Sequence, residues 1–443
     1  MGKFFRLVNN EYIKLLKKTS TKILLVLIVL AVIGFSLINF LSKSITIDDD
    51  PINYDYSEQI SWLNETKPDD YQAEIIFDEF LADNKVRADS VYYNTLNNIY
   101  QIVKTQNVDI KSFLYSAIDS SSWKEACQEL NEFSALDGDK WQYQYRLDNN
   151  IPFGDNWKNS VIQDISEAKN TLETLSGATS NAKERENYEK IEKICIYRLE
   201  NNIEIDASEY DLDLDTLDSD AMDYTINFWS VFFQSSSLVS IIGLIMIIIA
   251  GSCVSNEFSQ STYKLLLINP IKRYKILMSK YFTVISFGYI LLVLLFLLMI
   301  PFDGLFMGFK DISSAAFLLF KDGIVKEISP FLMVAKNYLL SSVEIVIFAT
   351  IAFTLSSLFK SSALAIGCGV FCMFGGNALV GILSMLNQDW GRYLIFANLD
   401  LASIANGITI FPQQSITFAV CNIIIHMFVF LLIAWDGFTK REC

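Results

Sequence analysis

The sequence has a single histidine, His426, and lacks a G-x-x-x-x-G-K-[ST] motif. Without that glycine-rich loop the chain does not cradle ATP phosphates by itself. A zinc hydrolase would want two or more histidines with a nearby carboxylate, so zinc catalysis is also excluded. No nucleophile–base pair stands out. We therefore expect no catalytic residue, no metal site and no cofactor, and we expect that the protein is not an enzyme.

Cysteine is sparse, with seven residues among 443. Four of them lie in or beside apolar runs, and Cys443 is the last residue. Only Cys127 and Cys195 fall in the long polar segment of the chain. Connectivity is not readable from sequence, so whether these two form a disulfide stays open.

Long apolar runs are what the sequence has in abundance, since 52% of its residues are hydrophobic and 33 are phenylalanine. A helix needs about 20 apolar residues to cross a bilayer. Six runs reach that length, which predicts an all-α polytopic membrane protein. The first run is full-length and follows a patterned segment, so we do not expect a cleaved signal peptide. The predicted spans are 23–41, 229–252, 282–302, 338–358, 363–386 and 415–435.

Lysine and arginine are unevenly distributed between the two sets of connecting segments. One set carries 14 basic residues, and the two short loops of the other set carry five. Basic residues favour the cytoplasmic side, which predicts a cell (plasma) membrane protein with both termini cytoplasmic. The cytoplasmic segments are then 1–22, 253–281, 359–362 and 436–443, and the outer segments are 42–228, 303–337 and 387–414.

The outer segment 42–228 has 39 acidic and 16 basic residues, a net charge of −23, which leaves about +8 for the rest of the chain. It is long enough to bury its own core. Apolar residues at mixed spacings of three and four predict a mainly helical extracellular domain, with helices in 69–105, 108–135, 155–176 and 180–202. No alternating pattern long enough for a sheet is visible. The acidic run 209–223 departs from a calcium loop at two positions, and we interpret it as a solvated linker.

Residues 3–18 have a broad apolar face flanked by Lys14, Lys17 and Lys18. This pattern predicts an amphipathic helix in the cytoplasmic interface, with its cations near anionic lipid.

A patterned polar stretch lies between the second and third spans, at 253–281. Phe258, Thr262, Leu265 and Leu266 fall at i, i+4, i+7 and i+8, which gives a short helix over 257–268 one apolar stripe. Pro270 ends that helix or starts a new turn, and basic residues follow where the chain re-enters the membrane.

This stretch resembles the first cytoplasmic loop of ABC-2-type permeases, the membrane subunits of one class of ATP-binding-cassette transporter. The resemblance implies a coupling helix that docks on a separate ATPase, with Phe258 and Arg273 among its residues. An ordinary basic amphipathic linker is the alternative. The matching positions are Glu257, Thr262, Lys264, Leu265, Leu266, Pro270, Arg273, Ser279 and Lys280.

The resemblance extends over 1–41 and about 229–443. The run W-G-R-Y-L-I-F-A-N-L-D-L within 387–414 resembles the segment before the last span in bacterial permeases of the peptide-immunity and drug-export type. In this family the second and fifth spans face the translocation path. The small residues of those spans are then implied to line it: Ser236, Ser240 and Gly243, with Gly369 and Gly376.

Glu344 lies inside the fourth predicted span, where ionisable groups are costly and mark pathways or partners. It is either a polar gate or a site for a cationic substrate, or else a carboxyl packed against a neighbouring serine or asparagine.

The resemblance thus implies the permease subunit of an ATP-driven ABC-2-type (type V) exporter. Its expected partners are two copies of an ATPase, a second permease in a homo- or heterodimer, and membrane lipids, with no nucleic acid. The acidic outer domain favours a cationic, amphipathic peptide or drug as substrate. The alternative is a surface receptor or peptide-sensing immunity protein whose outer domain binds ligand without transport.

Overall fold

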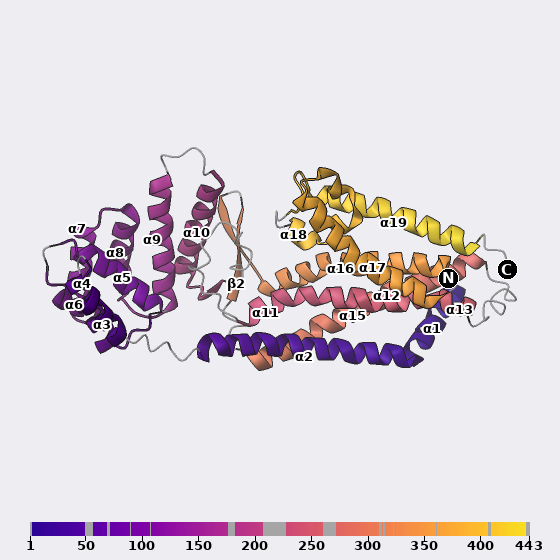
Figure 1. The fold of residues 1–443 in the computed structure, drawn as a ribbon, viewed down its shortest axis with the longest axis horizontal. Coiled ribbons are helices and arrows are strands. Elements are labelled where there is room, and N and C mark those ends of the chain that lie inside the picture. The colour runs from indigo at the N-terminus through magenta and orange to yellow at the C-terminus, as the bar shows by residue number, and fades with distance from the viewer. Residues whose placement is uncertain are drawn as a thin grey trace. The chain divides into compact units, whose positions relative to one another are not determined.

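Helices dominate the computed structural model, and the chain divides into two compact units (Figure 1). Unit 1 comprises Met1–Phe40, Met222–Ile312 and Pro330–Cys443, and unit 2 comprises Leu41–Ala221 and Ser313–Ser329. The structure describes residues 2–48, 56–68, 71–88, 90–106, 108–175, 182–206, 227–259, 272–309, 312, 315–321, 323–359, 361–405 and 409–439.

Unit 1 contains, within the described ranges, six helices long and apolar enough to cross a membrane, and they overlie the six apolar runs. The chain is therefore an α-helical, multi-pass membrane protein, as predicted. The spans are formed by α2 (Thr19–Asp48), by α11 (Phe228–Gln234), η3 (Ser235–Leu238) and α12 (Val239–Cys253) in succession, and by α15 (Arg273–Met307), α16 (Pro330–Leu358), α17 (Ser362–Met385) and α19 (Ile416–Thr439).

The second and fourth spans form the centre of unit 1, because α12 packs along α16 and also contacts α15 and α17. In the most apolar stretch of each of these two spans 61% of the residues are buried, against 17% for α19. Most of the exposed side chains of α19 are large and apolar, among them Ile424, Ile425 and Phe428. Such a surface suits lipid and not water.

The predicted N-terminal amphipathic helix is α1 (Gly2–Lys17), and only Lys18 separates it from α2. Its inward face packs on α15, where Phe4 meets the ring of Phe282 and the Tyr12 hydroxyl lies 2.5 Å from that of Ser286. Other apolar residues of α1, such as Phe5, are exposed. One side of α1 therefore packs against α15. Its location in the membrane interface stays a prediction.

Unit 2 is mainly helical, and its two largest cores join several helices around Leu96 and around Ile162. Two predicted helices are each divided in the structure, the first at Lys85 with a positive φ of 52° and the second after Ile118. Cys127 and Cys195 are both buried and lie in different cores. The helices are α3 (Tyr56–Thr66), α4 (Tyr71–Asp83), α5 (Val91–Val103), α6 (Ile110–Ile118), α7 (Trp123–Phe133), α8 (Asp137–Asn149), α9 (Trp157–Leu175) and α10 (Ala182–Asn201). The acidic run 209–223 lies outside the described residues.

A small sheet in unit 2 was not expected from the sequence. Strand β2 (Ala315–Lys321) pairs antiparallel with β3 (Ile324–Ile328), and its start pairs parallel with β1 (Ile205–Asp206). Leu318 and Ala316 of β2 pack against Ile194 and Ile203 in a third core. The segment 313–329, expected as part of an independent outer loop, therefore completes the fold of unit 2.

Burial of Leu318 predicts that the hairpin stabilises unit 2. In a fragment joining 41–221 to 313–329 by a flexible linker, Leu318→Ala should lower the free energy of unfolding by about 2–5 kcal/mol, as for other buried leucines. Ile324→Ala on the neighbouring strand is the matched control, because Ile324 is 61% exposed. Denaturant unfolding followed by circular dichroism measures both. Equal effects would show that the hairpin does not share this core.

A second prediction concerns pH. Burial raises the pKa of Asp164 on α9 to about 6, although Arg198 opposes the shift. A carboxyl with a raised folded pKa adds stability that is complete below its unfolded pKa, about 4, and is lost as the pH rises through 6. Asp164→Asn should therefore stabilise the same fragment at pH 7 by up to about 3 kcal/mol and flatten its pH profile between 4 and 7. Asp155→Asn, at an exposed position, should leave the profile unchanged. If the free energy of unfolding depends on pH in the same way for wild type and Asp164→Asn, the raised pKa of Asp164 would be contradicted.

Candidate functional site at the α1 end of the membrane unit

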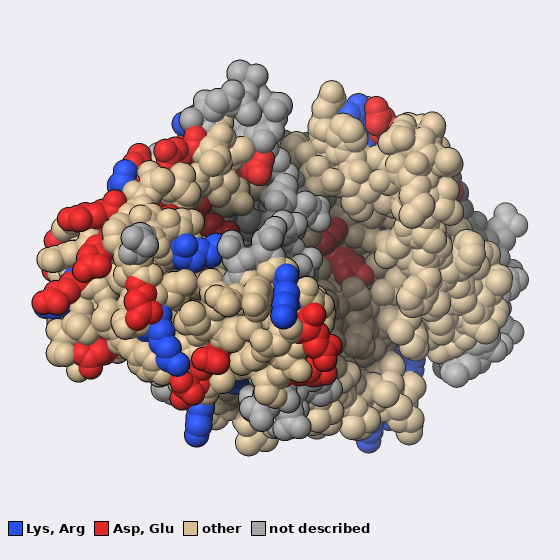
Figure 2. All heavy atoms as spheres, turned by 60° about the vertical axis from the view of Figure 1, so that its left-hand side comes forward, with Lys and Arg blue, Asp and Glu red and all other residues tan. Residues whose placement is uncertain are grey.

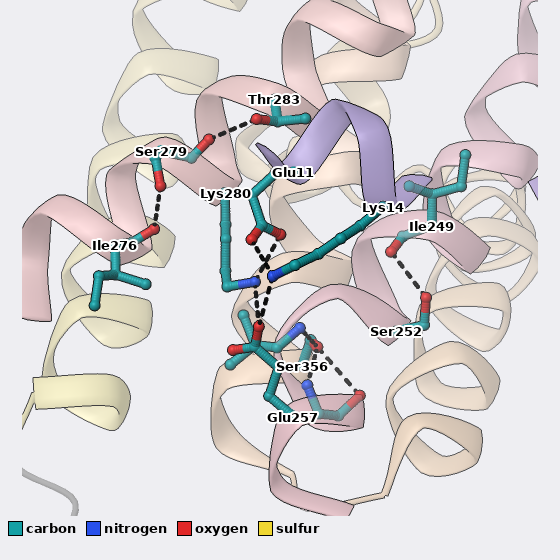
Figure 3. Close-up of polar contacts among 12 residues, drawn as sticks. Glu11, Lys14, Ile249, Ser252, Glu257, Ile276, Ser279, Lys280, Thr283 and Ser356 are labelled. Atoms are coloured by element: carbon teal, nitrogen blue, oxygen red, sulfur yellow. Dashed lines mark hydrogen bonds and ion pairs between the residues drawn. The ribbon is translucent and has the colours of Figure 1, made fainter. Parts of the chain in front are cut away.

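A buried ammonium group joins three segments of unit 1. The Lys280 Nζ atom of α15 lies 2.8 Å from Glu11 Oε2 on α1 and 2.6 Å from Glu257 Oε1 on α13 (Ser255–Ser259). The Lys280 side chain is 1% exposed. Lys14 Nζ adds a 2.8 Å pair with Glu11 and approaches Glu257 at 4.0 Å. Figure 3 shows these four side chains pointing toward one another, and we call them the ion cluster.

Helical spacing brings the α1 members of the cluster into place. Phe4, Val8 and Leu15 are spaced so that they share one face of α1 with Glu11. Val8 and Leu15 are buried, and packing of this face on α15 therefore presents the Glu11 carboxylate to Lys280. On α15, Lys280 lies two residues before Phe282, which contacts Phe4. Apolar contacts thus fix the register that the ion pair needs.

The charges of the cluster balance in a way that keeps Glu11 ionised. Burial alone raises the pKa of Glu11, but Lys280 and Lys14 outweigh that effect, and the net pKa lies below the ordinary value of 4.5. Glu11 therefore stays negative at neutral pH. A buried ammonium costs several kcal/mol in desolvation, which only well-placed counter-charges offset.

A serine fixes the chain direction where the second span ends. Ser356 Oγ of α16 accepts hydrogen bonds from the amides of Val254 and Ser255, at 3.1 and 3.0 Å. All three residues are buried. The break between α12 and α13 is therefore held against α16, and it sets the position from which Glu257 reaches Lys280.

The structure describes only the two ends of the predicted coupling segment. Glu257 lies in the ion cluster, and Arg273 donates a 3.3 Å hydrogen bond to the Thr439 carbonyl at the end of α19. Phe258 belongs to α13 by its backbone, and its side chain lies outside the described part. Thr262, Lys264, Leu265, Leu266 and Pro270 lie outside the described residues as well.

A cavity of about 440 Å³ opens beside the ion cluster. Its walls come from α1, the start of α2, the end of α12 with Glu257, and α15. Three lysines and two glutamates line it together with serine, threonine, asparagine and apolar side chains. No cluster of three potential metal ligands occurs in the described ranges, so nothing in this part of the chain recommends a metal here.

The small and polar residues predicted to line a path lie along the seam between α12 and its neighbours. Ser240 donates to Glu344 at 2.9 Å, and Ser236 accepts from Asn337 at 2.9 Å. Glu344 is therefore packed against a serine in this structure, and a role as a gate or as a site for a cationic substrate stays a prediction.

The three glycines of this predicted set allow close packing. A Cβ on Gly243 would touch Phe348 of α16 and lie near Glu344. A Cβ on Gly369 would clash with Ile247 of α12, and one on Gly376 with the ring of Phe396. A role of these residues in a path stays a prediction.

Two acidic residues with buried contacts, Glu11 of the ion cluster and Asp303 of α15, were not predicted from the sequence. Glu11 carried no signal beyond its place in an amphipathic helix. Asp303 lies just beyond the predicted third span, yet α15 continues to Met307 and encloses it. Asp303 is fully buried and accepts a 2.6 Å hydrogen bond from Ser36 of α2, while its Oδ2 has no partner in the described part of the chain. A carboxylate two residues after Pro301 was the available signal.

Residues 208–443 match a protein-family model described as "Protein of unknown function (DUF2705)". The chain belongs to this family. It is 34% identical over 259 residues to "Uncharacterized protein YhcI" of Bacillus subtilis (strain 168). This match covers 58% of this chain and 77% of that relative's length. It is 30% identical over 217 residues to "Uncharacterized membrane protein YdbK" of the same organism. That match covers 49% of this chain and 83% of the relative's length. The family region includes Glu257 and Lys280 and excludes Glu11.

The ion cluster makes a non-additive stability prediction. Lys280→Met leaves two carboxylates facing each other and should destabilise the protein by about 3–5 kcal/mol. Adding Glu11→Gln and Glu257→Gln to that variant should recover a large part of the loss, because the only charge left without its partner is then Lys14, whose side chain is 59% exposed. Thermal unfolding in detergent, followed by tryptophan fluorescence, reports the order of the melting temperatures. The control is Lys111→Met, which breaks an exposed pair with Glu79 and should change little. A triple variant less stable than Lys280→Met would contradict this reading.

Proposed function

We propose that the chain is the membrane-spanning subunit of an ATP-driven exporter of the ABC-2 type. It works with two copies of a separate ATPase and with a second permease subunit, and its termini face the cytoplasm. The observation that carries the proposal is the pairing of Glu257 with Lys280. These residues stand at the two ends of the segment that resembles the coupling loop of ABC-2 permeases.

In this proposal the segment 257–268 docks on the ATPase, and the ion cluster transmits its displacement. Lys280 links Glu257 to the third span, and Glu11 links both to α1. Ser356 links the end of α12 to α16. A pull on the loop therefore acts on α1, α12, α15 and α16 together, instead of only unwinding the last turn of one helix.

The route for the substrate lies along the α12 seam in this proposal. Its polar contacts are single hydrogen bonds, such as Ser240 to Glu344, and double-mutant cycles place such bonds in membranes at about 0.6 kcal/mol on average. Bonds this weak can be exchanged for contacts with a substrate. The carboxyl of Glu344 favours a cationic substrate, in keeping with the acidic outer segment. Asp and Glu side chains are spread over the visible face of unit 2, whereas other residues cover most of the visible face of unit 1 (Figure 2).

The test is coupling. The chain is co-expressed with the ATPase encoded beside it, purified, and placed in lipid nanodiscs and proteoliposomes. Wild type should show ATP hydrolysis stimulated by a cationic amphipathic peptide, together with transport of that peptide. Glu257→Gln should insert and bind the ATPase but lose roughly tenfold in stimulated hydrolysis and transport, in the range of ordinary coupling energies.

The matched control is Glu189→Gln, which removes an exposed carboxylate from a helical pair with Arg185 in unit 2. It should behave as wild type. Wild-type coupling in Glu257→Gln would remove the proposed role of the segment. If no ATPase co-purifies, and a panel of peptides binds the full chain without transport, the receptor alternative replaces the exporter.

A further inference from the structure

The cavity beside the ion cluster has no role in the coupling proposal, and its position points to lipid. Lys18 is the residue directly before α2, and Glu257 is the last residue of the second span. Both line the cavity, as does Lys280 near the start of the third span. The cavity therefore lies where three spans reach the membrane–water boundary, which is the level of phospholipid headgroups.

The lining divides into a polar rim and an apolar part. Lys14, Lys18 and Ser20 are exposed residues on the α1–α2 side. Leu24, Ile249 and Val284 are buried and supply apolar wall from three different spans. A ligand with a polar head and a hydrocarbon tail satisfies both parts, whereas a small soluble ion would leave the apolar wall in contact with water.

The net charge of the cavity lining indicates which kind of ligand headgroup the cavity would bind. Three lysines face two glutamates, which leaves one positive charge. Glu11 and Glu257 are both engaged by Lys280 and Lys14. Lys18 has no acidic partner among the residues that the structure describes. It therefore carries the one positive charge of the lining that the two glutamates do not neutralise. Lys18 also directly precedes the start of α2, and a helix N-terminus favours an anion.

We infer that this cavity binds the headgroup of a phospholipid with one net negative charge, such as phosphatidylglycerol, from the leaflet on the α1 side. Its phosphodiester pairs with Lys18 at the start of α2, and the first part of its acyl chains lies on Leu24 and Ile249. The inference depends on membrane insertion and not on coupling to an ATPase.

Cys253 provides a native reporter, because it lines the same cavity. The protein is reconstituted in nanodiscs of phosphatidylcholine alone or with phosphatidylglycerol and treated with a small maleimide. Alkylation is then mapped by peptide mass spectrometry. Phosphatidylglycerol should slow alkylation of Cys253 about fivefold, the effect expected of one lysine near an anionic headgroup. Cys368 on α17 does not line the cavity and serves as the internal control.

Lys18→Gln should abolish this protection, while the ion cluster keeps all its pairs and the protein its melting temperature. Lys22→Gln is the matched control, since Lys22 is an exposed lysine one turn further along α2 and does not line the cavity. It should keep the protection. Equal alkylation in both lipids, or equal loss in both variants, would overturn the site and leave only general surface charge.

A soluble phosphate ester is the other source of the same chemistry. Inorganic phosphate and glycerol phosphate are therefore added at millimolar concentration to phosphatidylcholine nanodiscs. Neither should protect Cys253, because neither covers the apolar wall. Protection as strong as that given by phosphatidylglycerol would replace the lipid with a soluble anion and overturn the proposal.

Discussion

The membrane unit is organised around one requirement, which is that the ammonium group of Lys280 must be neutralised where water does not reach it. The two carboxylates that meet this requirement come from segments far from Lys280 in sequence, Glu11 at a separation of 269 residues and Glu257 at 23. Because leaving a buried charge unpaired costs several kcal/mol, α1, α13 and α15 hold their relative positions together or lose them together. Along the α12–α16 seam, the polar contacts at Ser236 and Ser240 are single hydrogen bonds instead.

That contrast separates the membrane unit into a fixed part and an adjustable part. The α1 end combines charge-assisted pairs with the Ser356 contact to two amides, and each of these groups has more than one partner. The α12–α16 seam instead holds neutral or singly bonded pairs, such as Asn337 with Ser236. Small residues at Gly243 and Gly369 let α12 approach α16 and α17 closely. In a transporter, movement would be expected at the seam and transmission at the cluster.

The elements that depend on local sequence pattern could be predicted from the sequence. The contacts that depend on residues far apart in the chain could not. Apolar runs located the six spans, and helical spacing located α1 and most helices of unit 2. The β2 strand was missed because Ala315–Phe320 is a continuous apolar run without alternation, and because its partner β1 is only two residues long. Glu257 and Lys280 were singled out by motif, yet their pairing with Glu11 depends on the packing of α1 against α15. Asp303 was missed because its burial depends on Ser36 of another helix.

The ion cluster can also be viewed as two neutral pairs that share their charges. Glu11 has Lys14 one turn away on α1, and Glu257 has Lys280 across the loop between the second and third spans. Each segment therefore carries its own counter-charge before the two meet, so neither brings an uncompensated charge to the membrane. Contact then adds the cross pairs, Lys280 with Glu11 and Lys14 with Glu257. The family region contains the second pair and not the first. The N-terminal helix can accordingly join a five-span region in which Glu257 and Lys280 already neutralise each other, and Lys18 remains the one lysine at this end of the cavity whose charge the described protein does not neutralise.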